Sequence, residues 1–284
     1  MKNYLSLVKF SHTIFAMPFA LIGFSLALAL KSENLNWLLL VLVIFCMIFA
    51  RNSAMAFNRY VDRDFDKLNP RTAIREIPAG IINEKSALLF VILNSVLFIC
   101  TAFFINKLCF FLSPIALIII LGYSLTKRFT FLCHLVLGLG LSLAPIGAYL
   151  AVTGEFDWLP LLFSLAVLFW VSGFDVIYAL QDQDFDKQNK LNSIPVILGT
   201  KNSLLLSSVF HLITFILIFL AGFYGNFKIW YWIGAAIFSC LLFYQHIIIK
   251  PNDLSRINLA FFTTNGIASV AFAGFVILDL IFSF

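Results

Sequence analysis

Two acidic segments of this chain, 62–69 and 182–189, have almost the same sequence. They read D-R-D-F-D-K-L-N and D-Q-D-F-D-K-Q-N, and they match at six of eight positions with an offset of 120 residues. Each segment ends a long apolar stretch, where an unpaired carboxylate is costly to bury. The three aspartates of each segment therefore need cationic partners, and a divalent cation is the simplest partner for both segments.

The aspartate spacing in both segments matches the turns of an α-helix. Asn58, Asp62 and Asp66 are four residues apart, so a helix that continues through them carries all three on one stripe, while Asp64 points elsewhere. The second series is Asp175, Tyr178, Asp182 and Asp186, in which Tyr178 takes the place of Asn58. Carboxylate and amide oxygens are hard ligands suited to Mg²⁺, which often binds a few carboxylates together with substrate phosphates. Two such stripes that face each other predict a diphosphate held between magnesium ions.

A structural alternative applies to either segment alone, in which its aspartates are solvated loop acids paired with nearby Arg and Lys. Two matched segments, each at the end of an apolar helix, favour the metal site instead. The expected metal ligands are Asn58, Asp62, Asp66, Asp182 and Asp186.

A group of basic residues follows the first acidic segment. Asn-Pro at 69–70 and Ala-Gly at 79–80 are turn signals, which indicate an ordered loop beside the aspartates. Arginine binds phosphate through two parallel hydrogen bonds, and lysine binds it as a point charge. We therefore expect residues of this loop, and of the end of the fourth apolar segment, to bind a diphosphate. The alternative is that they are the ordinary basic residues of the cytoplasmic side of a membrane protein. These residues are Arg71, Arg75, Tyr123 and Lys127.

The composition is that of a membrane protein. Of the 284 residues, 62% are hydrophobic and only 12% are charged, and the mean hydropathy is +0.99, whereas about a quarter of the residues of a soluble domain are charged. Apolar stretches near the ~20 residues that cross a bilayer recur along the chain. The sequence predicts a single all-α domain over 1–284, with about nine transmembrane helices around a central cavity. The expected spans are 13–30, 36–57, 86–106, 108–124, 131–152, 158–180, 202–223, 228–249 and 258–282.

The basic residues predict the orientation of these spans. With nine spans, 16 of the 19 Lys and Arg residues lie on the side of the N-terminus, and only Lys31, Lys107 and Lys228 lie on the other. The positive-inside rule places the N-terminus and both acidic segments in the cytoplasm, most simply at a bacterial inner membrane. The net charge of +5 is therefore a topology signal and does not indicate nucleic-acid binding. The offset of 120 residues suggests an internal duplication, with motifs at 58–69 and 178–189.

The first apolar run has two interpretations. It is long and contains Pro18 and Gly23, which favours a helix retained in the mature protein. The Ala-Leu-Ala at 27–29 faintly resembles a signal-peptidase site, so a cleaved signal peptide is the alternative.

Together, these motifs resemble those of the UbiA superfamily of intramembrane prenyltransferases. That family pairs N-x3-D-x3-D after its second helix with Y-x3-D-x3-D after its sixth, and this chain has the same pair at 58–66 and 178–186. Shorter matches stand at 71–75, 123–128 and 197–199, and the likeness runs from about residue 10 to residue 280. One departure is R-E-I-P at 75–78, where many relatives have R-P-L-P. This variant resembles the branch of 4-hydroxybenzoate polyprenyltransferase-like members, some of which are tied to menaquinone synthesis.

The resemblance implies Mg²⁺-dependent transfer of a polyprenyl group from a polyprenyl diphosphate to a small aromatic acceptor, such as 4-hydroxybenzoate, in quinone biosynthesis. The prenyl tail would leave the site sideways toward lipid, and Lys127 or Arg71 would neutralise the departing diphosphate. The loop 67–80 is expected to help close the site against water. Asp182, Asp175 or Tyr178 would orient the acceptor's phenol. For a carboxylated acceptor, the candidate cations by position are Arg51 and His12.

Other functions remain as alternatives. Within the same family, the acceptor could be of the dihydroxynaphthoate type, or a haem, chlorophyll or lipid. A membrane transporter would also explain nine spans and a repeat, but transporter acids usually lie near the midplane within broken helices, whereas these follow the apolar spans. A CDP-alcohol transferase is disfavoured because its D-G-x2-A-R motif is absent.

Overall fold

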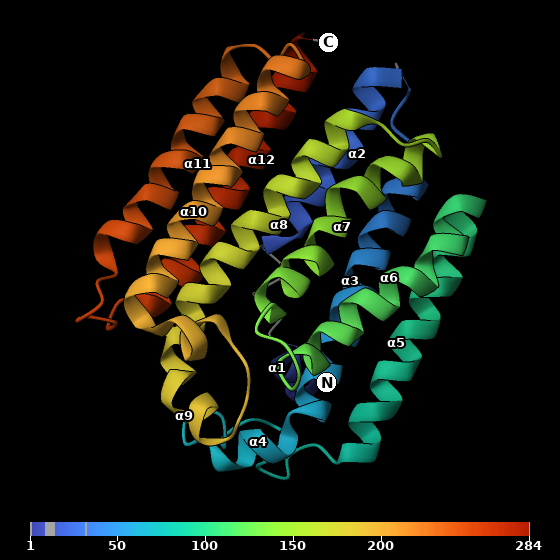
Figure 1. The fold of residues 1–284 in the computed structure, drawn as a ribbon. Helices are drawn as coiled ribbons and strands as arrows, with labels where there is room; N and C mark the ends of the chain where they lie inside the picture. Colours follow the sequence, from blue (N-terminus) through green and yellow to red (C-terminus); the bar gives the residue numbers. More distant parts are fainter. Residues whose placement is uncertain (1, 9–14, 32, 284) are drawn as a thin grey trace.

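The computed structural model describes residues 2–8, 15–31 and 33–283, and over these residues every regular element is helical. Figure 1 shows the long helices side by side, with the short helices α4 and α9 at the lower end of the bundle. The helices are α1 (Lys2–Leu7), α2 (Met17–Lys31), α3 (Trp37–Val61), α4 (Arg63–Leu68), α5 (Glu84–Ile105), α6 (Lys107–Thr126), α7 (Cys133–Thr153), α8 (Trp158–Ala179), α9 (Gln183–Gln188), α10 (Ile194–Tyr224), α11 (Ile229–Ile248) and α12 (Asn265–Ser283). The all-helical prediction is confirmed.

Eight of the helices in the described part of the chain are long and apolar enough to cross a membrane. The first expected span corresponds to α2, which has 15 helical residues and falls short of the ~20 needed for a full crossing. The last crossing helix combines α12 with the π-helical turn Leu259–Thr264 that precedes it. The count of about nine therefore holds as eight full-length helices and one shorter apolar helix.

One expected span begins earlier than the sequence indicated. The stretch predicted as 202–223 is part of α10, which starts at Ile194 and bends at Gly199. Gly199 has φ 72° and ψ 171°, in the region that glycine enters without a Cβ penalty. The bend separates the rest of α10 from its first turn, which lies beside His134.

Both acidic motifs interrupt a long helix in the same way. Asp62 ends α3 with φ −90° and ψ 5°, and Asp182 ends the short 3₁₀ turn after α8 with φ −106° and ψ 5°. A six-residue helix follows each break, and its last turn is closed by a backbone bond from Asn69 to Phe65, or from Asn189 to Phe185. The similar sequences therefore adopt similar backbone conformations at both positions.

The packed core holds one half of the bundle together. It includes the fully buried rings of Phe19, Phe163, Trp170 and Phe272, which come from α2, α8 and α12. Helices α7 and α8 lie very close, because a Cβ at Gly138 would stand 2.3 Å from the backbone oxygen of Leu168. This contact fixes α7 against the helix that carries the second acidic motif.

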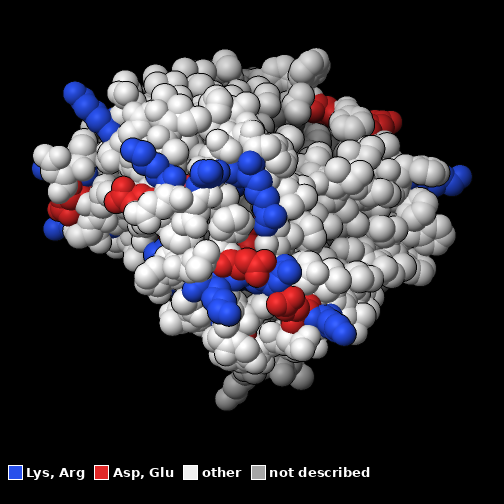
Figure 2. Space-filling model, turned by 60° about the horizontal axis from the view of Figure 1, so that its bottom comes forward, with Lys and Arg blue, Asp and Glu red and all other residues white. Residues whose placement is uncertain are grey.

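An apolar cavity of about 390 Å³ lies on the other side of α7, lined by residues of α3, α5, α6 and α7. Its walls include small residues such as Ala50, Ala144 and Gly147, and its polar lining includes Arg51 and Tyr123. Figure 2 looks at the lower end of the bundle and shows basic and acidic side chains gathered near its centre, within a mostly uncharged surface.

Candidate active site

The first acidic motif keeps its helical spacing through the break at Asp62. The backbone N–H of Asp62 donates to the Asn58 oxygen at 2.9 Å, and that of Asp66 donates to the Asp62 oxygen at 2.7 Å. The Asn58 side chain also donates to Asp62 Oδ2 at 2.9 Å. Although α3 itself stops at Val61, Asn58, Asp62 and Asp66 still stand on successive turns, as the spacing predicted.

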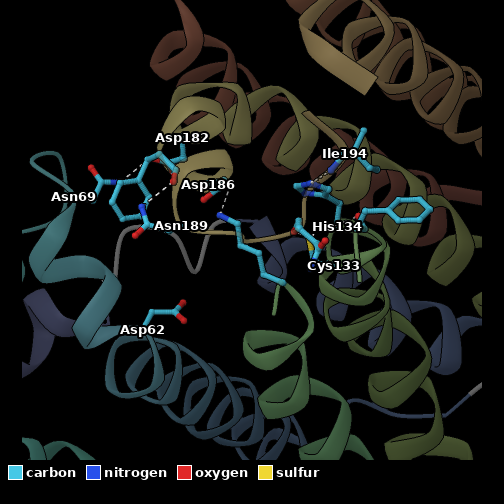
Figure 3. Close-up of polar contacts among 12 residues, drawn as sticks. Asp62, Asn69, Cys133, His134, Asp182, Asp186, Asn189 and Ile194 are labelled. Carbon is cyan, nitrogen blue, oxygen red and sulfur yellow. Dashed lines mark hydrogen bonds and ion pairs between the residues drawn. The ribbon is translucent and has the colours of Figure 1, made fainter. Parts of the chain in front are cut away.

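The loop after the first motif reaches the second motif. The Asn69 amide donates to Asp182 Oδ1 at 3.1 Å (Figure 3), and Arg71 Nε donates to the same oxygen at 3.0 Å. Arg71 Nη2 pairs with Asp182 Oδ2, which makes the arginine–carboxylate contact two-pronged. Arg71 Nη1 also donates to the Tyr178 hydroxyl at 3.1 Å. The loop therefore joins two segments that are more than 100 residues apart in sequence.

Two consecutive basic residues after α6 contact opposite motifs. Lys127 Nζ lies 2.6 Å from Asp186 Oδ2, and Arg128 Nη2 lies 3.6 Å from Asp62 Oδ1. Consecutive residues thus contact carboxylates of both motifs. In Figure 3, the labelled Asp62 and Asp186 lie on opposite sides of the site. A fourth pair joins Arg75 Nη1 to Asp66 Oδ1 at 2.6 Å.

Burial makes the charge of these carboxylates expensive. Asp66 is 5% exposed and Asp186 is 1% exposed. Burial, followed by repulsion from Asp66, raises the pKa of Asp62 to about 6, against the opposing effect of Lys127, Arg128 and Arg75. A cation bound between the motifs would favour the ionised carboxylates and lower such a pKa.

The oxygen-rich donor set fits a hard divalent cation, although the side chains are not gathered around one. Among the described residues, no three His, Cys, Asp or Glu side chains form a cluster that could hold a metal ion, and Asp66, Asp182 and Asp186 pair with arginine or lysine. Yet Asp66 Oδ2 is buried and lacks a hydrogen-bond partner in the described part of the chain. Such an oxygen requires a cation or a donor, and the neighbouring Asn58 and Asp62 add two more hard ligands.

Two of the remaining predicted residues, Tyr123 and Arg51, line the apolar cavity. Tyr123, expected at the diphosphate, lies one turn before Lys127. Arg51, a candidate for the acceptor carboxylate, lines the same cavity, and its Nη2 donates to the Val8 backbone oxygen at 3.5 Å. His12, the other candidate, lies outside the described residues. Tyr178 stacks on the ring of Phe261, with 4.1 Å between the ring centroids.

Asp175 has a partner that sequence analysis did not assign. Its Oδ2 lies 2.7 Å from His134 Nδ1. His134 is buried at the start of α7. The sequence gives no signal for this pair, because 41 residues separate His134 from Asp175. Asn69 and Arg128 were also not predicted as site residues. The turn signal at 69–70 pointed to the loop that contains Asn69, and Arg128 directly follows the predicted Lys127.

The sequence of the chain matches one family along most of its length. The model of the UbiA prenyltransferase family matches residues 16–267. Proteins of Tolumonas auensis and Photobacterium profundum, both named 4-hydroxybenzoate octaprenyltransferase, are 30% and 31% identical to this chain over 252 and 254 residues. Each of these two alignments covers 88% of both sequences.

Solved structures share the same arrangement of helices. The apo structure of a UbiA homologue from Aeropyrum pernix K1 has a TM-score of 0.85 and 30% identity, and the match covers 94% of this chain and 98% of that one. A UbiA homologue from Archaeoglobus fulgidus bound to GPP and Mg²⁺ has the same fold, with a TM-score of 0.74 and 23% identity over 98% of this chain and 99% of that one. Sequence and fold together show that this chain belongs to the UbiA prenyltransferase family.

Proposed function

We propose that this protein transfers a polyprenyl group from a polyprenyl diphosphate to a small aromatic acceptor, with 4-hydroxybenzoate as the first acceptor to test. Membership of the family makes the chain a prenyltransferase. The observation that carries the proposal is the pair of aspartate motifs, which are joined through Arg71, Lys127 and Arg128 above an apolar cavity. A charged headgroup site next to an apolar cavity suits a donor that has a diphosphate head and a hydrocarbon tail.

The diphosphate would be held between the two motifs. Asn58, Asp62 and Asp66 on one side, and Asp182 and Asp186 on the other, offer ligands for magnesium. When bound, magnesium would neutralise negative charge on the departing diphosphate. We assign diphosphate binding to basic side chains that now contact these aspartates, because a guanidinium or ammonium group that pairs with a carboxylate can pair with a phosphate in the same way. They are Arg71, Arg75 and Lys127.

The prenyl tail would occupy the apolar cavity below the diphosphate. Small side chains at Ala50, Ala144 and Gly147 leave room for it between α3 and α7. Breaking the bond between the prenyl carbon and the diphosphate oxygen sends the electron pair to the diphosphate and leaves an allylic cation. The apolar walls exclude water, which would otherwise capture the cation as an alcohol.

The aromatic ring would then attack the allylic cation at the level of Tyr123, between the cavity and the carboxylates. An electron-rich ring is favoured because its π electrons form the new carbon–carbon bond. Support for 4-hydroxybenzoate comes from the names of the Tolumonas auensis and Photobacterium profundum relatives. Arg51 is the candidate for binding the acceptor's carboxylate, because it lines the cavity near Tyr123.

We further propose that the chain is one domain in a bacterial inner membrane, with both acidic motifs on the cytoplasmic side. The gathering of charged residues at one end of the bundle supports this orientation through the positive-inside rule. The matching breaks at Asp62 and Asp182 support an internal duplication.

The proposal can be tested with membranes that contain the protein, incubated with Mg²⁺, a polyprenyl diphosphate and a panel of aromatic acids. Mass spectrometry of the products should detect one acid increased by the mass of the prenyl group. The Asp62→Ala variant and a sample treated with EDTA should form none. A wild-type protein that prenylates no aromatic acid, but another acceptor class, would contradict the assignment.

A further inference from the structure

Asp175 lies on the part of α8 that faces the site. It precedes Tyr178 by three residues, so the two side chains are neighbours on α8, and the Tyr178 hydroxyl accepts a hydrogen bond from Arg71 at 3.1 Å. Asp175 is therefore placed one helical turn further into the bundle than the contact between Tyr178 and Arg71 at the carboxylate site.

His134 holds one oxygen of this carboxylate. Nδ1 of His134 lies 2.7 Å from Asp175 Oδ2, and on the opposite edge of the ring the backbone N–H of Ile194 donates to Nε2 at 3.4 Å (Figure 3). A backbone N–H is always a donor, so Nε2 acts as the acceptor and the ring proton belongs on Nδ1. His134 therefore donates to Asp175 Oδ2.

The ring is fixed from several sides. His134 is 2% exposed, and its backbone oxygen accepts a hydrogen bond from Ser172 at 3.2 Å. The close contact of α7 and α8 at Gly138 keeps the two helices in register, one turn further along α7. Among the described residues, His134 is the only group that hydrogen-bonds to the Asp175 side chain. One carboxylate oxygen is thus anchored, and the other is left for a ligand.

We propose that Asp175 accepts the proton released from the aromatic ring and that His134 is the positioning residue that orients Asp175. This inference rests on the proposed aromatic prenyl transfer. The observation behind it is a buried imidazole, hydrogen-bonded at both ring nitrogens, that donates to a carboxylate one helical turn from Tyr178.

The reaction balances with the groups named. The prenyl–oxygen bond breaks and its electrons leave with the diphosphate, and a π pair of the ring forms the carbon–carbon bond. The ring carbon then loses its proton to the second oxygen of Asp175, and the C–H electrons restore aromaticity. Asp175 afterwards returns the proton to water.

The test uses two variants of similar shape, His134→Gln and His134→Met, and measures prenylation of 4-hydroxybenzoate by the full-length protein in lipid vesicles. A glutamine amide can donate to Asp175, whereas a methionine side chain of about the same length cannot. His134→Gln should keep kcat within about 3-fold of wild type. His134→Met should lower kcat by about 10- to 100-fold, as does the loss of a hydrogen bond that orients a functional group. The KM for the prenyl diphosphate should not change in either variant.

A third variant, Asp175→Asn, keeps an oxygen that accepts from His134 but has no basic oxygen, and it should lower kcat by about 100-fold or more. It also serves if His134→Met fails to fold. Equal kcat values for the methionine and glutamine variants, or wild-type kcat in Asp175→Asn, would overturn the inference while leaving prenyl transfer intact. A wild-type protein that prenylates no aromatic acid would remove both proposals together.

Discussion

Each of the four candidate metal-binding aspartates lies against a different basic side chain. The pairs are Asp62 with Arg128, Asp66 with Arg75, Asp182 with Arg71 and Asp186 with Lys127. Neutralised carboxylates can be buried at the end of an apolar bundle at a much lower cost than bare ones. When a metal ion binds the carboxylates, the same basic side chains can turn toward a diphosphate. The carboxylates and the basic side chains then each still have a partner of opposite charge.

The aspartates within one motif should differ sharply in importance. Asp186 is 1% exposed and faces Lys127, whereas Asp184, two residues earlier, is exposed. Asp186→Asn should lower the rate of prenyl transfer by about 100-fold, because an amide is a poorer ligand for magnesium. Asp184→Asn, which removes the same charge from the same short helix, should leave the rate within a factor of about two. Equal losses in the two variants would show that only the net charge of the segment matters.

Arg71 should act through its geometry as well as its charge. Its guanidinium contacts both oxygens of Asp182 and the Tyr178 hydroxyl, which a lysine ammonium group cannot reproduce. Arg71→Lys should raise the KM for the prenyl diphosphate by about 10-fold, since about 1.4 kcal/mol of binding free energy corresponds to that factor. Lys67→Arg, at an exposed position nearby, is the control and should leave the KM unchanged.

At the scale of the elements, each motif depends on a break in a long helix. The breaks at Asp62 and Asp182 turn α4 and α9 away from the long helices, so that the loop after α4 can reach α8. Without them, each helix would continue outward, and Arg71 would be carried away from Asp182. The bend at Gly199 has a similar effect on α10, because it places Ile194 next to His134.

Gly199 should be required for its backbone conformation alone. A Cβ there would meet no atom within 4 Å, but its φ of 72° is unfavourable for any L side chain. Gly199→Ala should therefore lower the free energy of unfolding by about 1–2 kcal/mol, measured as a lower melting temperature in detergent. Gly274→Ala is the matched control, because a Cβ at this position in α12 also meets no atom and its φ is not positive. If Gly274→Ala destabilised the protein as much as Gly199→Ala, backbone strain would not be the cause.

At the scale of the whole molecule, the acidic motifs and the apolar cavity are neighbours. Tyr123 belongs to the cavity wall, and Lys127, one turn later on the same stretch of chain, belongs to the carboxylate site. The charged end seen in Figure 2 therefore lies beside the space proposed for the prenyl tail.

Filling the cavity should restrict the protein to prenyl diphosphates with shorter chains. Gly147 lines the cavity, and a Cβ there would meet no atom within 4 Å, so a larger side chain would extend into the free space. Gly147→Phe should lower kcat/KM for a long polyprenyl diphosphate by about 10-fold or more, and that for a five-carbon donor much less. Gly274→Phe, outside the cavity lining, should lower neither value. A uniform loss for all donor lengths in Gly147→Phe would place the tail elsewhere.

The sequence by itself determined the class of the fold and most of the site. Apolar length fixed the number of helices to within one short helix, because any bilayer-spanning segment must satisfy its own backbone hydrogen bonds. Four-residue spacing also placed Asn58, Asp62 and Asp66 on successive turns. These properties are local, so they can be derived from neighbouring residues alone.

Only the tertiary structure decided which basic residue meets which aspartate and how His134 is used. Lys127 pairs with Asp186, and Arg128 with Asp62, because two helices from distant parts of the sequence meet the end of α6. His134 and Asp175 come together because α7 and α8 pack at close range at Gly138. Such pairings depend on the positions of the helix ends in space. Packing contacts throughout the interior set these positions, so no single segment of the sequence determines them.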